Sequence, residues 1–275
     1  MGCGIWRSAV PRGEYKRLEG VTALWGFVHG FSTRLGGFSL PPYNSLNLGS
    51  SSGDNLAGVE RNRRHFLSAI GCRNTPVQTL KQVHSTDIIL IGTDDSVPDT
   101  PMPGDALVTD RRNLLVGIFT ADCYPILLAD PQRKVMAAVH AGWRGAAGGI
   151  ISRAIDAMKI GWGCQPACLI ALIGAGIGPC CYQVGQEVYQ SFTDEQPEGR
   201  DWFRPDRCPD RRLGPTWRLD LLAAITAQLR QSGLAEGGIH ALGECTACHP
   251  ELYFSYRRDG AATGRMLSVI GIAAS

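Results

Sequence analysis

The sequence predicts an α+β fold or a layered sandwich, because strand-like and helix-like segments are mixed along the chain without regular alternation. Short apolar segments bounded by glycine and polar residues are typical of buried strands. Of the 275 residues, 44% are hydrophobic and 19% are charged, so the chain has enough apolar surface for a substantial core. We expect residues 1–275 to form a single catalytic domain.

Each expected element is marked by its own pattern. Apolar segments predict strands at 77–80, 88–91, 106–109, 114–119, 134–139, 169–173 and 266–272. Helical periodicity predicts helices at 54–70, 146–158, 186–192 and 219–231, with Asp54 as the first N-cap and Gly71 as the stop signal. Residues 193–216 are polar and rich in Pro, Arg and Asp, so we expect a surface excursion there.

Charge and hydropathy exclude several functional classes. The 27 basic and 25 acidic residues give a formal net charge of +2, which offers no basic footprint for nucleic acid or an anionic membrane. No apolar run approaches the ~20 residues that span a bilayer. Met1 to Tyr15 lacks the uninterrupted apolar stretch of a secretory signal. We therefore expect a cytoplasmic protein.

The ten cysteines do not predict a disulfide framework, because the chain is large and carries no export signal. Most, Cys168 among them, are interpreted as buried free thiols in apolar surroundings. Cys245 and Cys248 form a C-x-x-C pair beside His249, which resembles half of a structural zinc site or a redox pair. No second half is visible in the sequence, so the pair receives no assigned role.

Three ligand-type residues lie where predicted strands stop, namely His84, Cys123 and His140. Adjacent strand ends can bring such side chains to one point. Two imidazoles and one thiolate suit zinc, with a fourth tetrahedral position left open, and an open position is typical of a catalytic site. The same residues also fit a catalytic pair in which Cys123 is the nucleophile and His140 the base.

A set of ordered motifs links the chain to a known family. In order, they are GF at 26–27, FSTRLGG at 31–37, YNSLNLG at 43–49, QVHS at 82–85, DALVT at 105–109, ADCYP at 121–125, VHAGWRG at 139–145, GIGPCCY at 176–182, SYRRDG at 255–260 and TGR at 263–265. Together they resemble the YfiH/laccase-domain family, once labelled multicopper polyphenol oxidoreductases, over about residues 26–270.

The resemblance implies a compact α/β/β/α sandwich with mixed sheets, related to the bacterial toxin deamidases. It implies a metal site that maps onto His84, Cys123 and His140. Family members are described as zinc-dependent purine nucleoside enzymes. They phosphorolyse adenosine, inosine, guanosine and methylthioadenosine, and they hydrolytically deaminate adenosine. The implied small-molecule partners are therefore purine nucleosides and phosphate.

Substrate-binding residues are expected in the loops of these motifs. Arg34 and Arg144 lie in glycine-flanked loops, where a guanidinium can either bind phosphate oxygens or brace the loop. Asn44 can hydrogen-bond a base or ribose, or form an Asx-turn. Cys181 lies in a family motif and is expected to line the pocket. Asp122, beside Cys123, either takes part in catalysis or holds the loop.

Three rival functions use the same residues. A His₂Cys set also occurs in blue-copper centres, so a copper-dependent polyphenol oxidase is one alternative. Its trinuclear cluster needs more histidines than the four left over from six, which are His29, His65, His240 and His249. A zinc amidase that edits peptidoglycan precursors is the second alternative, and a non-catalytic binding module is the third. We expect zinc as the cofactor, with copper as the alternative metal.

Overall fold

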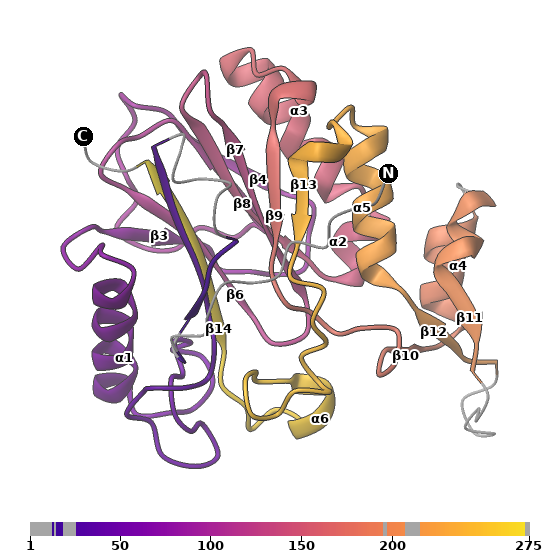
Figure 1. Cartoon of the computed structure of the whole chain (residues 1–275), viewed down its shortest axis with the longest axis horizontal. Helices are drawn as coiled ribbons and strands as arrows, with labels where there is room; N and C mark the ends of the chain where they lie inside the picture. The colour runs from indigo at the N-terminus through magenta and orange to yellow at the C-terminus, as the bar shows by residue number, and fades with distance from the viewer. Residues whose placement is uncertain (1–12, 14, 19–25, 195–196, 207–214, 273–275) are drawn as a thin grey trace.

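Two β-sheets stack face to face, and helices cover their outer faces (Figure 1). This arrangement comes from a computed structural model that describes residues 13, 15–18, 26–194, 197–206 and 215–272. Most of the segment from Met1 to Tyr15 and parts of the expected excursion at 193–216 lie outside the described residues.

The first sheet has the strand order β1-β2-β14-β6-β3. Its strands are β1 (Tyr15–Lys16), β2 (Phe27–Ser32), β14 (Met266–Ile272), β6 (Leu115–Thr120) and β3 (Val77–Thr79). The central strand β14 pairs antiparallel with both neighbours, and β3 pairs parallel with β6. The two ends of the chain are therefore brought together in one sheet.

The second sheet has the order β13-β9-β7-β8-β5-β4. Its strands are β13 (Ile239–Ala241), β9 (Ile170–Ile173), β7 (Tyr124–Asp130), β8 (Val135–Ala141), β5 (Ala106–Thr109) and β4 (Ile88–Ile91). Every residue of the antiparallel pair β7 and β8 is buried. Burial on both faces explains why these strands are continuously apolar instead of alternating.

Three apolar layers hold the sheets and helices together. Side chains from the facing sides of both sheets form the central layer, including Phe31, Ile118, Leu127 and Leu172. The helix α1 (Leu56–Ala69) packs through Phe66 and Ile70 on the outer face of the first sheet. The layer order is α/β/β/α, as the family resemblance predicted.

Several helices cover the second sheet from its outer side. They are α2 (Trp143–Ala147), α3 (Ile150–Trp162) and α5 (Leu221–Gln231), with α4 (Gln186–Thr193) beyond them. A final short helix, α6 (Tyr256–Asp259), follows the last long loop. Among the described residues, no helix is both long and apolar enough to cross a membrane.

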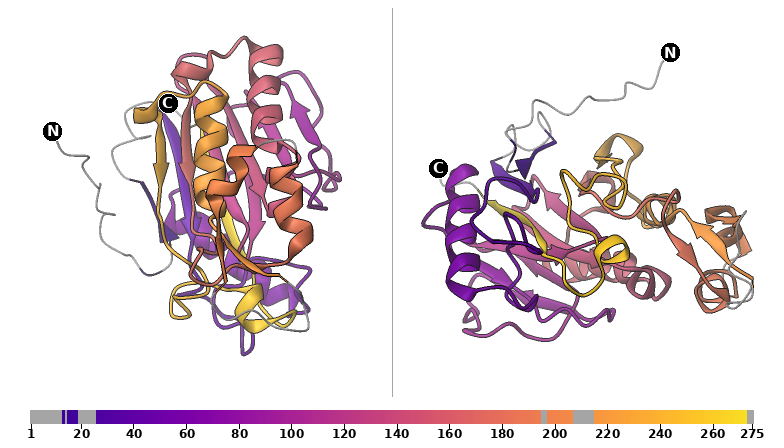
Figure 2. Two further views of the ribbon diagram at one scale, coloured as in Figure 1. Left: turned by 90° about the vertical axis from the view of Figure 1, so that its right-hand side faces the viewer. Right: turned by 90° about the horizontal axis from the view of Figure 1, so that it is seen from below.

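The expected surface excursion is partly a packed unit that projects from the body (Figure 2). A small sheet joins β10 (Gln183–Val184), β12 (Trp217–Leu219) and β11 (Phe203–Pro205). Tyr189 of α4 stacks on Trp217 with ring centroids 4.5 Å apart. Within residues 193–216, Trp202 and Phe203 are buried, so aromatic packing orders part of the predicted excursion.

Two predictions about helices were wrong in detail. The N-cap of α1 is Asn55, whose side chain accepts from the Gly58 amide at 3.0 Å, whereas Asp54 accepts from the Asn47 side chain. The expected helix at 146–158 is interrupted, because Gly149 adopts a φ of +78° between α2 and α3. A left-handed residue cannot continue a right-handed helix.

The prediction for Cys168 was also wrong, because this thiol is exposed. It ends a 3₁₀ turn, Pro166–Cys168, just before β9. Leu169, the next residue, is the first to be buried. The prediction treated Cys168 as part of the apolar strand, whereas it belongs to the turn that precedes the strand.

Asn62 of α1 fastens the loop at residues 38–47 to the helix. Its side chain is fully buried. The amide nitrogen donates to Ser39 Oγ and to the carbonyls of Ser45 and Asn47, and the amide oxygen accepts from the Phe38 backbone at 2.8 Å. One side chain therefore satisfies four polar groups that have little access to water.

We expect Asn62→Ala to lower the free energy of unfolding by about 2–3 kcal/mol, because buried partners lose their hydrogen bonds. Urea unfolding followed by circular dichroism measures this change. Arg64→Ala, at an exposed position of the same helix, is the control and should change stability by at most about 0.5 kcal/mol. Equal effects of the two substitutions would contradict the role given to Asn62.

Candidate metal centre and its cavity

The fold brings His84, Cys123 and His140 together. One ligand atom from each lies within 4.8 Å of the others. Cys123 Sγ is 3.9 Å from His84 Nε2, and the two imidazole centroids are 4.8 Å apart. His84 follows β3, Cys123 lies between β6 and β7, and His140 is the sixth residue of β8.

The backbone around these residues is tightly constrained. His84 has a φ of +59° and Asp122 a φ of +89°, both in the left-handed region. A side chain at Gly142 would place its Cβ 3.0 Å from Cys123 Sγ and 3.2 Å from the His84 ring. Glycine at this position therefore leaves room for the two ligand side chains to meet.

Asp105, the first residue of the DALVT motif, positions both histidines. The carboxylate is fully buried and accepts from the backbone amides of Val83, His84 and Ser85 at 2.7–3.1 Å. His140 Nδ1 lies 2.7 Å from Asp105 Oδ1. With Nδ1 as the donor, His140 Nε2 is left to act as a ligand, as in the carboxylate–histidine pairs of many zinc sites.

Asp105 was not predicted as a site residue. Its only signal was its position directly before a buried strand in a family motif. Burial raises the pKa of this carboxyl group, but hydrogen bonds from His140, Ser85 and Val83 outweigh burial and lower it to about 2. Asp105 is therefore a fixed negative charge at neutral pH.

The charge of His140 is coupled to that of Cys123. Burial works to raise the pKa of Cys123, but the charge and hydrogen bonds of His140 and His84 lower it to about 6. Burial works to lower the pKa of His140, but Cys123 and Asp105 raise it to about 9. Between these values, the metal-free side chains form a thiolate–imidazolium pair.

The donor set fits a divalent transition metal. Zinc takes nitrogen at about 2.0–2.1 Å and sulfur at about 2.3 Å in tetrahedral geometry, which separates the donors by roughly 3.3–3.8 Å. The Cys123–His84 separation of 3.9 Å needs little adjustment to meet this. Of the six histidines, all of them in the described ranges, only His84 and His140 belong to a cluster able to hold a metal. That number is too small for a multi-copper centre.

A cavity of about 940 Å³ opens from the three ligands. Its wall is formed by segments from both sheets and from the loop after β9. Four cationic side chains line it, and three aromatic ones. These are Arg63, Lys81, Arg257 and Arg265, and Phe119, Tyr182 and Tyr256.

The predicted substrate residues Arg34 and Asn44 are not among the residues that line this cavity. Arg34 Nε donates to the Asn44 carbonyl at 2.9 Å, and Arg34 Nη1 donates to the Pro250 carbonyl at 3.0 Å. The guanidinium also lies over the Phe254 ring, 4.7 Å from its centroid. These contacts match the loop-bracing alternative for Arg34.

Arg144 and Cys181 also lie outside the cavity lining. Arg144 is exposed on α2, with its guanidinium 4.4 Å from the centroid of the Trp143 ring. Cys181 Sγ lies 3.4 Å from Cys248 Sγ, in a separate cluster of cysteines. Of the predicted site residues, the structure places the three metal ligands in the cavity lining and the four expected substrate residues outside it.

Asp122 holds the loop that carries Cys123. One carboxylate oxygen accepts from Thr246 Oγ1 and the other from the Arg257 amide, both at 2.6 Å. Both oxygens are therefore engaged by the chain itself. This is the loop-holding alternative that the sequence left open for Asp122.

The cavity cations were missed by sequence reasoning, although two of them lie in quoted motifs. Arg257 belongs to SYRRDG and Arg265 to TGR. Arg63 lies on α1 and Lys81 follows β3, in segments that carry no motif signal. Only the packing of the two sheets brings these four side chains to one cavity.

Comparison with known proteins identifies the family. Residues 28–273 match the family described as multi-copper polyphenol oxidoreductase laccase. The chain belongs to this family. The family name refers to copper, whereas the cavity of this member presents one His₂Cys donor set.

Curated relatives in the family carry a different description. Purine nucleoside phosphorylase YlmD of Geobacillus stearothermophilus is 35% identical over 253 residues, covering 90% of each chain. A purine nucleoside phosphorylase of Deinococcus radiodurans is 38% identical over 244 residues, covering 89% of this chain and 88% of the relative. Human purine nucleoside phosphorylase LACC1 is 33% identical over 254 residues, and the match spans 90% of this chain and 56% of the human protein.

Solved structures share the fold over almost the whole chain. The Bacillus licheniformis hypothetical protein YfiH aligns with a TM-score of 0.87 and 30% identity, covering 96% of this chain and 98% of its own. YlmD from Geobacillus stearothermophilus aligns with a TM-score of 0.84 and 33% identity, covering 97% and 99%.

Asp105→Asn should weaken zinc binding by about 10–100-fold, because loss of a carboxylate partner makes a histidine ligand less basic and less well oriented. Competition with a chelating dye measures the affinity. Asp87→Asn removes an exposed carboxylate from the same turn and should leave the affinity unchanged. A zinc affinity of the Asp105 variant equal to wild type would show that the carboxylate does not act on the ligand.

In metal-free protein, Cys123 should react with iodoacetamide with a midpoint near pH 6, because its pKa is lowered to about 6 and the thiolate is the nucleophile. The modified fraction rises with pH, since deprotonation creates the reactive form. Peptide mass spectrometry at each pH measures it, with a free cysteine-containing peptide as the reference, whose thiol reacts nearer the usual value of about 8.5. Coincident profiles for the two thiols would contradict the thiolate–imidazolium pair.

Proposed function

We propose that this chain is a zinc-dependent purine nucleoside phosphorylase whose reactive centre is formed by His84, Cys123 and His140. Its substrates are adenosine, inosine, guanosine and methylthioadenosine, together with inorganic phosphate. The single observation that carries the proposal is the convergence of the metal-ligating trio and four cations on one cavity. The names of the curated relatives support the same activity.

The size of the cavity suits a nucleoside. A volume of about 940 Å³ lies at the upper end of the range for small-molecule sites. Phe119, Tyr182 and Tyr256 provide aromatic surface in the lining, and aromatic rings stack well on planar bases. The base of the substrate is therefore expected on the side of these rings.

The cationic side chains that line the cavity can bind phosphate. Arg265 is largely buried, and burial lowers the pKa of its guanidinium, yet arginine keeps its charge in proteins. Arg63 and Arg257 are held by backbone carbonyls, those of Leu48 and Gln183. Arginine donors fixed in this way can bind phosphate oxygens in pairs and leave little conformational freedom to be lost on binding.

For phosphorolysis, the main task of the chain is to hold phosphate and the nucleoside in the correct relative position. A phosphate oxygen forms a bond to C1′ while the glycosidic bond breaks, and the base leaves with the electron pair and takes up the proton that hydrogen phosphate loses. A divalent cation held by His84, Cys123 and His140 would supply Lewis acidity. The protein residues hold the phosphate, stack the base and keep Asp105 and His140 in their fixed orientation.

Hydrolytic deamination of adenosine is a second activity of the proposed site. It needs a proton donor for the departing amine. Asp122 is the one carboxylate among the described residues that line the cavity, and both its oxygens are occupied by Thr246 and Arg257. This favours phosphorolysis as the main reaction, with deamination slower.

The decisive experiment incubates zinc-loaded protein with adenosine, with and without phosphate, and separates adenine, inosine and hypoxanthine by chromatography. Adenine formed only with phosphate is the expected product, and inosine formed without phosphate measures deamination. His140→Ala should abolish both products, whereas His249→Ala, a histidine outside the cavity, should not. Absence of any product that depends on His140 would overturn the nucleoside assignment.

The rival functions are tested with the same protein. Copper-dependent polyphenol oxidation predicts oxygen uptake with a phenolic substrate after copper loading. Peptidoglycan editing predicts cleavage of an amide bond in a cell-wall precursor peptide by the zinc form. Either activity in excess of phosphorolysis, and dependent on Cys123, would favour that rival.

Arg63→Gln should raise the KM for phosphate by about 10–100-fold with a smaller change in kcat, because a charge-assisted hydrogen bond to an anion contributes about 1.5–3 kcal/mol. Initial rates at varied phosphate measure this. Arg64→Gln changes the next residue, which is exposed and outside the cavity lining, and should leave the KM unchanged. If the KM for phosphate is unaltered in both variants, phosphate does not bind at Arg63 of α1.

A further inference from the structure

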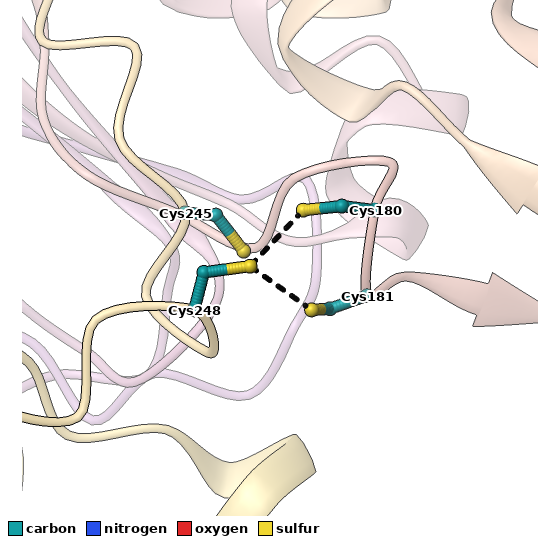
Figure 3. Close-up of side chains that lie close together, drawn as sticks. All are labelled: Cys180, Cys181, Cys245 and Cys248. Atoms are coloured by element: carbon teal, nitrogen blue, oxygen red, sulfur yellow. Dashed lines mark hydrogen bonds between the residues drawn. The ribbon is translucent and has the colours of Figure 1, made fainter.

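A second cluster of possible metal ligands lies outside the cavity lining. Its members are Cys180, Cys181, Cys245 and Cys248, whose sulfur atoms all lie within 4.8 Å of one another. Figure 3 shows the four side chains pointing inward from two loops. The sequence interpretation that the C-x-x-C pair has no second half was therefore wrong, because Cys180 and Cys181 provide it from a distant segment.

The sulfur geometry is close to that of a tetrahedral metal site. Cys248 Sγ lies 3.3 Å from Cys180 Sγ and 3.4 Å from Cys181 Sγ. Four thiolates at about 2.3 Å from one zinc ion are separated by roughly 3.8 Å. A tetrahedral set of four sulfurs is typical of structural zinc.

Thiol–thiol contacts alone give little reason for this crowding. A thiol is a weak donor and a weak acceptor. A metal ion bound by the four sulfurs would displace the thiol protons and account for the close approach of the side chains.

The backbone already provides the hydrogen bonds that metal-bound thiolates use. The Gly178 amide donates to Cys245 Sγ at 3.2 Å, and the Cys248 amide also donates to this sulfur. A side chain at Gly178 would place its Cβ 3.2 Å from the Cys245 Cβ and 3.4 Å from Cys180 Sγ. Amide–sulfur hydrogen bonds of this kind stabilise and orient thiolate ligands.

Two guanidinium groups lie against the two halves of the cluster. Arg218 Nη1 donates to the Cys180 carbonyl at 3.0 Å. Arg258 Nη1 donates to the Thr246 carbonyl at 2.9 Å, inside the C-x-x-C turn. Both guanidinium groups also form ion pairs, Arg218 with Asp206 and Arg258 with Asp259, so their role at the cluster is to hold the backbone of its two loops.

We propose that Cys180, Cys181, Cys245 and Cys248 form a structural zinc site, separate from the His84–Cys123–His140 centre. It joins the loop after β9 to the loop before α6. The Thr246 amide donates to the Gly176 carbonyl and the Gly176 amide to the Glu244 carbonyl, which already aligns these loops, and zinc coordinated by the four sulfurs joins them at a second point. The proposal does not depend on the reaction that the cavity catalyses.

The site supports the wall of the cavity. Ile177, one residue from Gly178, lines the cavity, and its amide donates to the Asp122 carbonyl at 2.8 Å. Thr246, within the C-x-x-C turn, donates to the Asp122 carboxylate. Zinc at the four cysteines therefore holds in place the segment that carries Cys123.

The test measures zinc per chain by elemental analysis after gel filtration. The double variant Cys180→Ser/Cys248→Ser should lose one zinc per chain relative to wild type, and its melting temperature should fall. Cys168→Ser, the control at an exposed cysteine outside both clusters, should keep the wild-type zinc content and melting temperature. Wild-type zinc content in the double variant would overturn the proposal.

Spectroscopy on protein that keeps all four cysteines avoids any folding defect of the double variant. His84→Ala removes a ligand of the other centre, so the zinc that remains should show four sulfur neighbours at about 2.3 Å in X-ray absorption. Cobalt loading of the same variant should give the intense absorption bands of tetrahedral thiolate coordination. Nitrogen neighbours at the remaining zinc, bound iron, or a Cys180–Cys248 disulfide found by mass spectrometry would each overturn the assignment.

Discussion

The carboxylate of Asp105 is the contact on which the candidate site depends. It lies directly before β5 and accepts from three consecutive amides of the turn that carries His84, and its contact with Nδ1 orients the His140 ring on β8. A buried charge is costly unless it is fully hydrogen-bonded, and this one is. The positions of the two histidines are therefore set by a single group, and the thiolate–imidazolium pair of Cys123 and His140 depends on the same charge.

The sequence predicted much of the secondary structure, because the strands that surround the core are continuously apolar. The observed β4, β5 and β14 coincide with the predicted segments, and β6 and β8 differ by one or two residues. The same pattern located the three ligand-type residues, since Cys123 directly precedes β7, His140 lies near the end of β8, and His84 lies in the loop between β3 and β4. The pairing of the sheets was available only through the family resemblance, because periodicity does not say which apolar faces meet.

Features that depend on distant segments were not predictable in this way. Arg63 and Arg265 line one cavity but come from α1 and from the residue before β14. Cys181 and Cys248 are 67 residues apart and touch only because two loops run side by side. By contrast, Arg34 lies in a loop that was expected to bind substrate, but its guanidinium donates to backbone carbonyls of the chain. Spacing identifies residues that are able to bind, but tertiary packing decides what they face.

The connection between β6 and β7 has a further consequence. These strands belong to different sheets, yet only Ala121, Asp122 and Cys123 join them. Removing or adding one residue there would turn every side chain of one strand to the opposite face, because strand side chains alternate. Both sheets therefore constrain the length of this three-residue connection. Any attempt to transplant the His₂Cys centre to another scaffold must therefore carry both sheets with it.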